Sequence, residues 1–118
     1  MYTKYDYPPI NTVGEVNNDA GSLEIVSAST GMKIHINKIV MSVHEPAVGG
    51  GGKLRVQDTL GSEIFTIDAN SVKEFEVNFG EPEGYEMDRS VGIHVIVYGA
   101  TIENASASVA ISGYKSFQ

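Results

Sequence analysis

The fold is decided by the stretch MKIHINKIVMSVH at residues 32–44. Apolar side chains recur there at every second position, in two sets: Met32, Ile34 and Ile36, then Ile39, Met41 and Val43. Alternation with a period of two is typical of a β-strand that buries one face. The phase slips by one residue at Asn37 and Lys38, and a β-bulge or a strand break there would keep both apolar sets on one face.

Most of the remaining chain continues this period-two pattern. Residues 90–100 are apolar at almost every position, which predicts a central strand buried on both sides. Turn-forming residues separate the stretches, notably at residues 46–52 and 80–89, and no apolar stripe of helical period exceeds two turns. Shorter strands are predicted at residues 22–27, Lys53–Asp58, Glu63–Asp68, 71–79 and 105–114.

Several short strands at this spacing predict an all-β fold, a jelly-roll-like β-sandwich with two sheets packed face to face. The length of 118 residues suits one domain with an ordinary core. The predicted core consists of apolar residues on the inward phase of the strands: Ile34, Ile36, Ile39, Met41, Val43, Leu54, Val56, Ile67, Phe75, Val77, Ile93, Val95, Val97, Val109 and Ile111.

The first 21 residues differ from the rest and predict an extended N-terminal arm, ahead of a sandwich domain at residues 22–118. Two adjacent prolines hold an extended backbone and cannot donate ladder hydrogen bonds, and a short strand is expected at residues 12–16. The aromatic side chains of the arm require a surface that covers them, either the chain's own sandwich or a neighbouring subunit. The candidate partner-binding residues are Tyr2, Tyr5, Tyr7, Pro8, Pro9 and Ile10.

Charge and composition exclude several classes of function. Eight Lys and Arg residues against fifteen Asp and Glu residues give a net charge of −7, which opposes binding to nucleic acid or to anionic membranes. Cysteine is absent, which removes disulfides, zinc–thiolate sites and cysteine nucleophiles. No apolar run approaches the roughly 20 residues of a membrane-spanning helix, and the N-terminus lacks the apolar segment of a signal peptide.

The motifs that would carry chemistry are weak. The glycine run at residues 49–52 lacks the Gly-Lys-Ser/Thr ending of a phosphate loop and is interpreted as a flexible hairpin loop. His35 and His94 each stand between apolar neighbours, which predicts partly exposed strand histidines, and a site that joins them to His44 is the alternative. No Gly-x-Ser-x-Gly nucleophile motif occurs. We therefore expect no catalytic residue, no metal and no cofactor.

An acid-rich stretch covers residues 74–88, which hold six acidic side chains and no Lys or Arg. Four of these acids fall in one predicted loop: Glu81, Glu83, Glu86 and Asp88. Calcium requires about six to eight converging oxygens, and the Asp-x-Asp-x-Asp-Gly spacing is missing. The loop is interpreted as a solvated surface, and the alternatives are a docking surface for a basic partner and a bound cation.

Two longer stretches carry a resemblance to a known family. Residues 53–82 read KLRVQDTLGSEIFTIDANSVKEFEVNFGEP, and residues 91–117 read VGIHVIVYGATIENASASVAISGYKSF. A polar hairpin, a strand that reaches an FGEPEG turn, a very apolar strand and a small-residue strand ending in Gly-Tyr follow one another. This order resembles the small β-sandwich virion proteins of tailed bacteriophages, in particular head decoration (cement) proteins.

The resemblance implies a structural protein rather than an enzyme. It implies that the chain binds the outside of a phage capsid, contacts the major capsid protein and stabilises the shell, commonly as a homotrimer. It also implies a location on the virion after synthesis in the host cytoplasm, with no nucleic acid, membrane or cofactor as partner. The arm residues would then contact the capsid or a neighbouring subunit.

Two other classes of function stay open. The domain is also compatible with a carbohydrate- or receptor-binding module of a phage tail or a cell-surface protein, because sandwiches of this kind serve both purposes. Tyr85 or Tyr98 would then stack on the sugar. An enzyme of the cupin type is the third class, and it requires a bound metal.

Overall fold

The computed structural model describes residues 9–17, 22–45, 52–98 and 106–117. This part of the chain forms strands and no helix, so it holds no helix long and apolar enough to cross a membrane. The strands are β1 (Pro9–Asn17), β2 (Ser22–Val26), β3 (Lys33–Glu45), β4 (Lys53–Asp58), β5 (Glu63–Asp68), β6 (Lys73–Asn78), β7 (Tyr85–Arg89), β8 (Ile93–Tyr98) and β9 (Ser106–Ser116).

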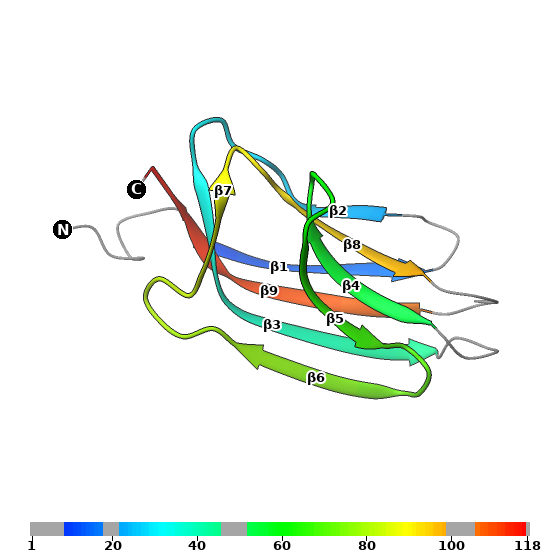
Figure 1. The fold of residues 1–118 in the computed structure, drawn as a ribbon. Coiled ribbons are helices and arrows are strands. Elements are labelled where there is room, and N and C mark those ends of the chain that lie inside the picture. The colour runs from blue at the N-terminus through cyan, green and yellow to red at the C-terminus, as the bar shows by residue number, and fades with distance from the viewer. Residues whose placement is uncertain (1–8, 18–21, 46–51, 99–105, 118) are drawn as a thin grey trace.

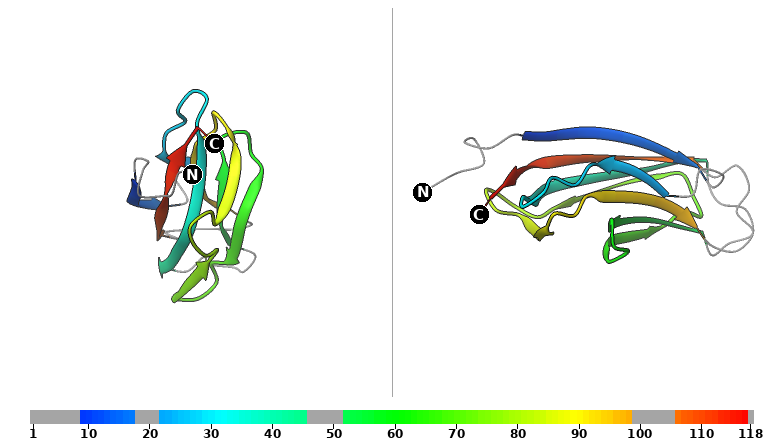
Figure 2. Two further views of the ribbon diagram at one scale, coloured as in Figure 1. Left: turned by 90° about the vertical axis from the view of Figure 1, so that its left-hand side faces the viewer. Right: turned by 90° about the horizontal axis from the view of Figure 1, so that it is seen from above.

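The strands form two antiparallel sheets that pack as a sandwich (Figures 1 and 2). One sheet has the order β1-β9-β3-β6, with β7 also paired to β3, and the other has the order β2-β8-β4-β5. Strands from opposite ends of the chain are nested in pairs that alternate between the sheets: β1 with β9, β2 with β8, β3 with β6, and β4 with β5. This nesting is the jelly-roll arrangement, so the predicted fold class is confirmed.

The long strand β3 contains the predicted bulge. Ile36 is paired with Gly113 of β9 and Lys38 with Ser112, so Asn37 has no partner in the ladder. The extra residue restores the phase, so Ile34 and Ile36 before Asn37 and Ile39, Met41 and Val43 after it are buried on the core side, while Met32 precedes the strand and is half-buried. The bulge therefore allows one strand of 13 residues to contribute apolar side chains to the core both before and after Asn37.

β6 and β7 act as one interrupted edge strand. Both are antiparallel to β3, β6 opposite residues 38–43 and β7 opposite residues 33–36, while β9 occupies the other side of β3. The prediction of a loop across residues 80–89 is therefore wrong for Tyr85–Arg89. The strand was not predicted because the apolar residues Tyr85 and Met87 stand among charged residues. The Met87 side chain is nevertheless buried.

β1 lies inside the segment that the sequence predicted to be an arm, and it includes the expected strand at residues 12–16. It pairs with β9 from Pro9 opposite Tyr114 to Asn17 opposite Ser106. Ile10 and Val16 belong to the core, so the described sandwich begins at Pro9. Residues 1–8 and 18–21 of the predicted arm, and residues 46–51 of the predicted glycine-rich loop, lie outside the described residues.

The predicted core is confirmed except on the edge strands. Ile67 of β5 and Val77 of β6 are only partly buried, and Phe75 of β6 is 42% exposed. Phe75 does face inward, because it is paired with the buried Met41, but an edge strand has a neighbour on one side only. The remaining predicted core residues are buried.

β8 is central in its sheet, between β2 and β4, but it is not buried on both sides as predicted. Ile93, Val95 and Val97 are buried, whereas His94 and Ile96 on the opposite face are half-buried. Among the described residues only the inner face of this sheet is covered by the second sheet. An unbroken apolar run therefore overstated the burial of this strand.

Replacing the buried Ile39 tests the position of the core. Ile39→Ala should lower the free energy of unfolding by about 2–5 kcal/mol, because it leaves a cavity between the sheets. Val13→Ala on β1, where the side chain is 67% exposed, should change it by less than about 1 kcal/mol. Urea unfolding measures both, and equal losses would contradict this packing.

Candidate functional site

The candidate site is the loop of residues 79–84, FGEPEG, which interrupts the edge strand opposite the bulge of β3. Gly80 and Gly84 have φ angles of +92° and +58°, which favour glycine. At Gly84 a Cβ atom would lie 2.1 Å from the Ile36 carbonyl oxygen, so the loop approaches the backbone of β3 too closely for any other residue. The FGEPEG turn predicted from the sequence is thus a tight loop that packs directly against the backbone of β3.

Asn37, the bulge residue, holds this loop. Its side chain is buried, and its Nδ2 donates hydrogen bonds to the Gly80 carbonyl at 2.8 Å and to the Pro82 carbonyl at 3.0 Å. Its own carbonyl accepts a hydrogen bond from the Phe79 amide at 2.8 Å. One residue therefore fixes the beginning and the middle of the loop. The sequence signalled this residue only through the phase slip.

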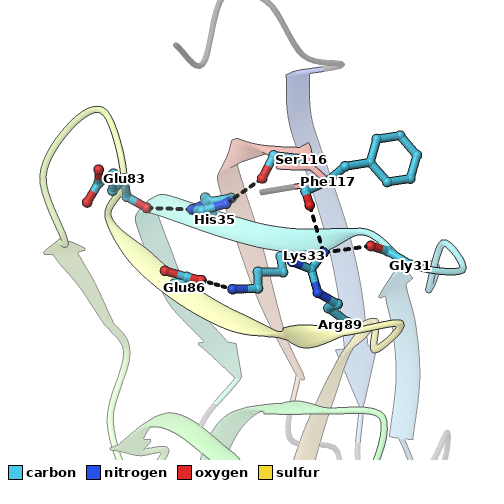
Figure 3. Close-up of polar contacts among 8 residues, drawn as sticks. All are labelled: Gly31, Lys33, His35, Glu83, Glu86, Arg89, Ser116 and Phe117. Carbon is cyan, nitrogen blue, oxygen red and sulfur yellow. Dashed lines mark hydrogen bonds and ion pairs between the residues drawn. The ribbon is translucent and has the colours of Figure 1, made fainter. Parts of the chain in front are cut away.

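His35 fixes the end of the loop (Figure 3). Its Nδ1 lies 3.1 Å from the Glu83 carbonyl oxygen and its Nε2 lies 2.8 Å from Ser116 Oγ. A carbonyl oxygen can only accept, so Nδ1 carries a proton and, in the neutral ring, Nε2 accepts from the serine hydroxyl. The ring also stacks on Tyr114, with centroids 4.5 Å apart and planes 2° apart.

The prediction that His35 is partly exposed is wrong, because its side chain is only 5% exposed. The hydrogen-bonded pair His35–Ser116 resembles the His–Ser pair of a hydrolase only in its residue types. Both residues are buried, so a substrate cannot reach them. His94 instead faces Glu24 at 3.6 Å, and His44 lies 3.0 Å from Ser108 Oγ. In the described ranges, no three His, Cys, Asp or Glu residues are grouped closely enough to hold a metal ion.

β7, which continues from the loop, is held at both of its ends (Figure 3). Glu86 forms an ion pair with Lys33 of β3. The hydrogen bond and the positive charge from Lys33 hold the pKa of the Glu86 carboxyl below its ordinary value. Arg89 Nη1 donates to the Gly31 carbonyl at 2.9 Å and to the Phe117 carbonyl at 2.8 Å, which joins β7 to the end of β9.

The arrangement presents carboxylates on a fixed backbone. Glu81, Glu83 and Asp88 are exposed, and Figure 3 shows the Glu83 carboxylate turned away from His35 while its carbonyl faces the ring. Fixed, solvent-facing charges suit recognition of a partner, because little conformational freedom is lost on binding. The loop that the sequence marked as acidic is therefore an ordered acidic surface.

The residues predicted to bind a partner fall in two groups. Tyr2, Tyr5, Tyr7 and Pro8 lie outside the described residues. Pro9 is exposed at the start of β1, and Ile10 is buried in the core. Both line a hollow of about 520 Å³ that also includes Asn37 and Glu81. The structure thus brings the beginning of β1 close to the acidic loop, which the sequence did not predict.

Tyr85 and Tyr98, the residues named for sugar stacking, are 36% and 38% exposed. They lie on different sheets, Tyr85 on β7 and Tyr98 on β8. Tyr85 contacts Phe79, with ring centroids 5.4 Å apart. The two tyrosines therefore do not form one stacking platform.

Comparison with known proteins identifies a structural likeness. No protein family model matches the sequence, and no curated protein matches it. The fold is similar to that of a chain in the structure titled "Acidic stable capsid structure of Helicobacter pylori bacteriophage KHP30", with a TM-score of 0.63 and 14% sequence identity. The match covers 94% of this chain and 90% of that chain, so the two chains share the fold over nearly their whole lengths.

Removing the Asn37 amide should loosen the loop. Asn37→Ala deprives the Gly80 and Pro82 carbonyls of their donor, and it should lower the free energy of unfolding by about 1–3 kcal/mol. Amide hydrogen exchange in residues 79–84 should become faster. Asn11→Ala, at an exposed position of β1, is the matched control and should change neither quantity measurably. Unchanged exchange in Asn37→Ala would show that the loop holds its shape without the amide.

The Lys33–Glu86 pair should make stability depend on pH in the acidic range. Because the pKa of Glu86 is lowered in the folded state, its contribution is present above the ordinary value of 4.5 and is lost as pH falls through the lower folded value. The difference in Tm between the unmodified chain and Glu86→Gln should therefore be larger at pH 7 than at about pH 3. In a Lys33→Met background this pH-dependent difference should shrink, because Lys33 is the main cause of the lowered pKa of Glu86 and His35 and Arg89 contribute less. An undiminished difference would assign the effect to other charges.

Proposed function

We propose that this chain is a structural virion protein that binds the outside of a phage capsid and stabilises it, as a homotrimer and without catalytic activity. The observation that carries the proposal is the likeness to a chain of a phage capsid structure over nearly the whole of both chains. That chain is therefore as small as this one, which suits an accessory protein. The order of sequence features resembles head decoration proteins independently of this match.

The physical character of the molecule supports the same proposal. A jelly roll with an ordered acidic surface can bind by burying apolar area and matching charges, and it requires no reactive group. The partner would be the major capsid protein. A net charge of −7 opposes a role in binding the packaged nucleic acid or a membrane. The protein would be made in the host cytoplasm and would then reside on the virion surface.

The carbohydrate- or receptor-binding alternative has weaker support, because its two candidate tyrosines lie on different sheets. It makes a distinct prediction, since a glycan array would then show specific binding. Binding to glycans together with no binding to capsids would replace the proposed function by this alternative.

Shortening the N-terminus tests the proposed contact. Deletion of residues 1–8 should weaken binding to capsids of the phage that encodes the chain, measured by co-sedimentation, because it removes Tyr2, Tyr5, Tyr7 and Pro8. The deletion stops before Ile10, so the core and the unfolding midpoint should stay unchanged. Undiminished binding by the shortened chain would remove the arm from the proposed contact.

The oligomeric state is a separate test. Light scattering coupled to size exclusion should give three times the chain mass of 12.7 kDa, either free or after release from capsids. The Tyr-containing arm can contribute to subunit contacts, so the same measurement on the chain without residues 1–8 separates oligomer formation from capsid binding. A monomer in both preparations would contradict the proposed trimer.

A further inference from the structure

One edge of the sandwich is rich in acidic side chains. Residues 63–89, which contain β5, β6 and β7, carry eight acidic and two basic side chains and hence a charge of −6. Glu86, Glu76 and Asp68 are paired with Lys33, Lys38 and Lys53, which leaves a charge of −3 when these lysines are included. The segment nevertheless holds eight of the fifteen acidic residues of the chain, and Glu81, Glu83 and Asp88 are exposed on it.

The same edge exposes aromatic surface. β5 and β6 are edge strands of the two sheets and follow one another along the chain (Figure 1). Phe65 stacks on Phe75 with centroids 5.6 Å apart, and Phe79 contacts Tyr85 with centroids 5.4 Å apart. We call these residues together with Val77 the aromatic seam: Phe65, Phe75, Val77, Phe79 and Tyr85.

The seam is only partly covered. Phe75 and Val77 alternate along β6 opposite the buried Met41 and Ile39, so both point toward the gap between the sheets, and Phe79 directly follows the strand. Phe75 is 42% exposed and Tyr85 is 36% exposed, while the others are half-buried. Clustered aromatic side chains that stay accessible to water are typical of the centre of a protein interface, where their burial contributes much of the binding free energy.

We propose that the aromatic seam is the docking surface for a protein partner that presents aliphatic side chains surrounded by Lys and Arg. The apolar part of such a surface would cover Phe75 and Tyr85, and its basic residues would meet the carboxylates of the edge. A second copy of this chain does not fit, because joining two such edges would place like charges together. The ordered loop of residues 79–84 keeps the acidic rim in place before binding.

This inference deepens the proposed function, and it rests on that function only for the identity of the partner. If the partner is a capsid, the seam is the face that meets it. Binding to the seam can be tested without any capsid, so a negative result for the proposed function would not contradict the inference about the seam. Loss of capsid binding in the intact chain with retained seam binding would overturn the proposed function alone.

The test uses the full chain and short synthetic peptides as probes. Titration with the peptide KKLPLKK, followed by NMR of backbone and aromatic signals, should shift the signals of Phe65, Phe75, Phe79 and Tyr85 together. The peptides EELPLEE and KKSPSKK should bind more weakly, because each lacks one of the two required features. Shifts confined to another face, or equal binding of all three peptides, would overturn the proposal.

Variants separate the apolar and the charged contributions. Phe75→Ser should weaken KKLPLKK binding at least about tenfold, whereas Val13→Ser, at a more exposed apolar position on β1, should leave it unchanged. The double variant Glu83→Gln with Asp88→Asn should reduce the salt dependence of binding. Its control, Glu15→Gln with Glu45→Gln, neutralises two exposed acids outside the edge and should not.

The two double variants test the contribution of the carboxylates even if Phe75→Ser does not fold. Both double variants alter exposed side chains only, so their folding is expected to survive. The amide NMR spectrum of each variant checks this directly. If the two folded double variants bind KKLPLKK with the same salt dependence, the carboxylates of the edge play no part and the proposal is wrong.

Discussion

The bulge residue Asn37 of β3 is the constraint on which the rest of the structure depends. β3 is bonded to β9 along one side and to β6 and β7 along the other, so an extra residue at Asn37 affects three neighbours at once. It keeps two apolar sets of opposite phase on the core face. Its backbone carbonyl and its side-chain amide form hydrogen bonds with the loop of residues 79–84. The interruption of the edge strand falls opposite this same residue. One insertion thus sets both the continuity of the core and the place of the acidic loop.

Satisfaction of buried polar groups explains why the loop is ordered despite its charge. A six-residue excursion with two acidic side chains has no apolar core of its own, and its carbonyl groups need donors. Asn37 and His35, neighbours on β3 separated by Ile36, supply them from below. The carboxylates can then face solvent, because the hydrogen bonds that hold the loop use its backbone. The site therefore depends on two buried polar residues in the central strand more than on the acids that make it visible in the sequence.

Much of the fold could be predicted from the sequence, because a period of two specifies which face of a strand is buried. The irregularity at Asn37 was predictable for the same reason, since a bulge or a strand break is needed to reconcile the phases of Ile36 and Ile39, and the structure shows the bulge. β7 was missed because Tyr85 and the buried Met87 alternate with acidic residues. The burial of His35 and the exposure of Phe75 were mispredicted because both depend on neighbours distant in sequence, the loop and Ser116 in one case and a sheet edge in the other. The periodicity of a strand shows which face a side chain lies on, whereas its burial depends on the residues that cover it.

The two proposed contact elements belong to opposite edge strands of one sheet, although the start of β1 and the acidic loop line one hollow. In the order β1-β9-β3-β6, β1 carries the end of the chain that holds the candidate arm, and β6 with β7 carries the aromatic seam. Under the proposed function, the arm can contact neighbouring copies, and its deletion then weakens capsid binding through the loss of these contacts, while the acidic, aromatic edge meets the capsid. This division fits the charges, because the edge that repels a second copy is the one left for a different partner.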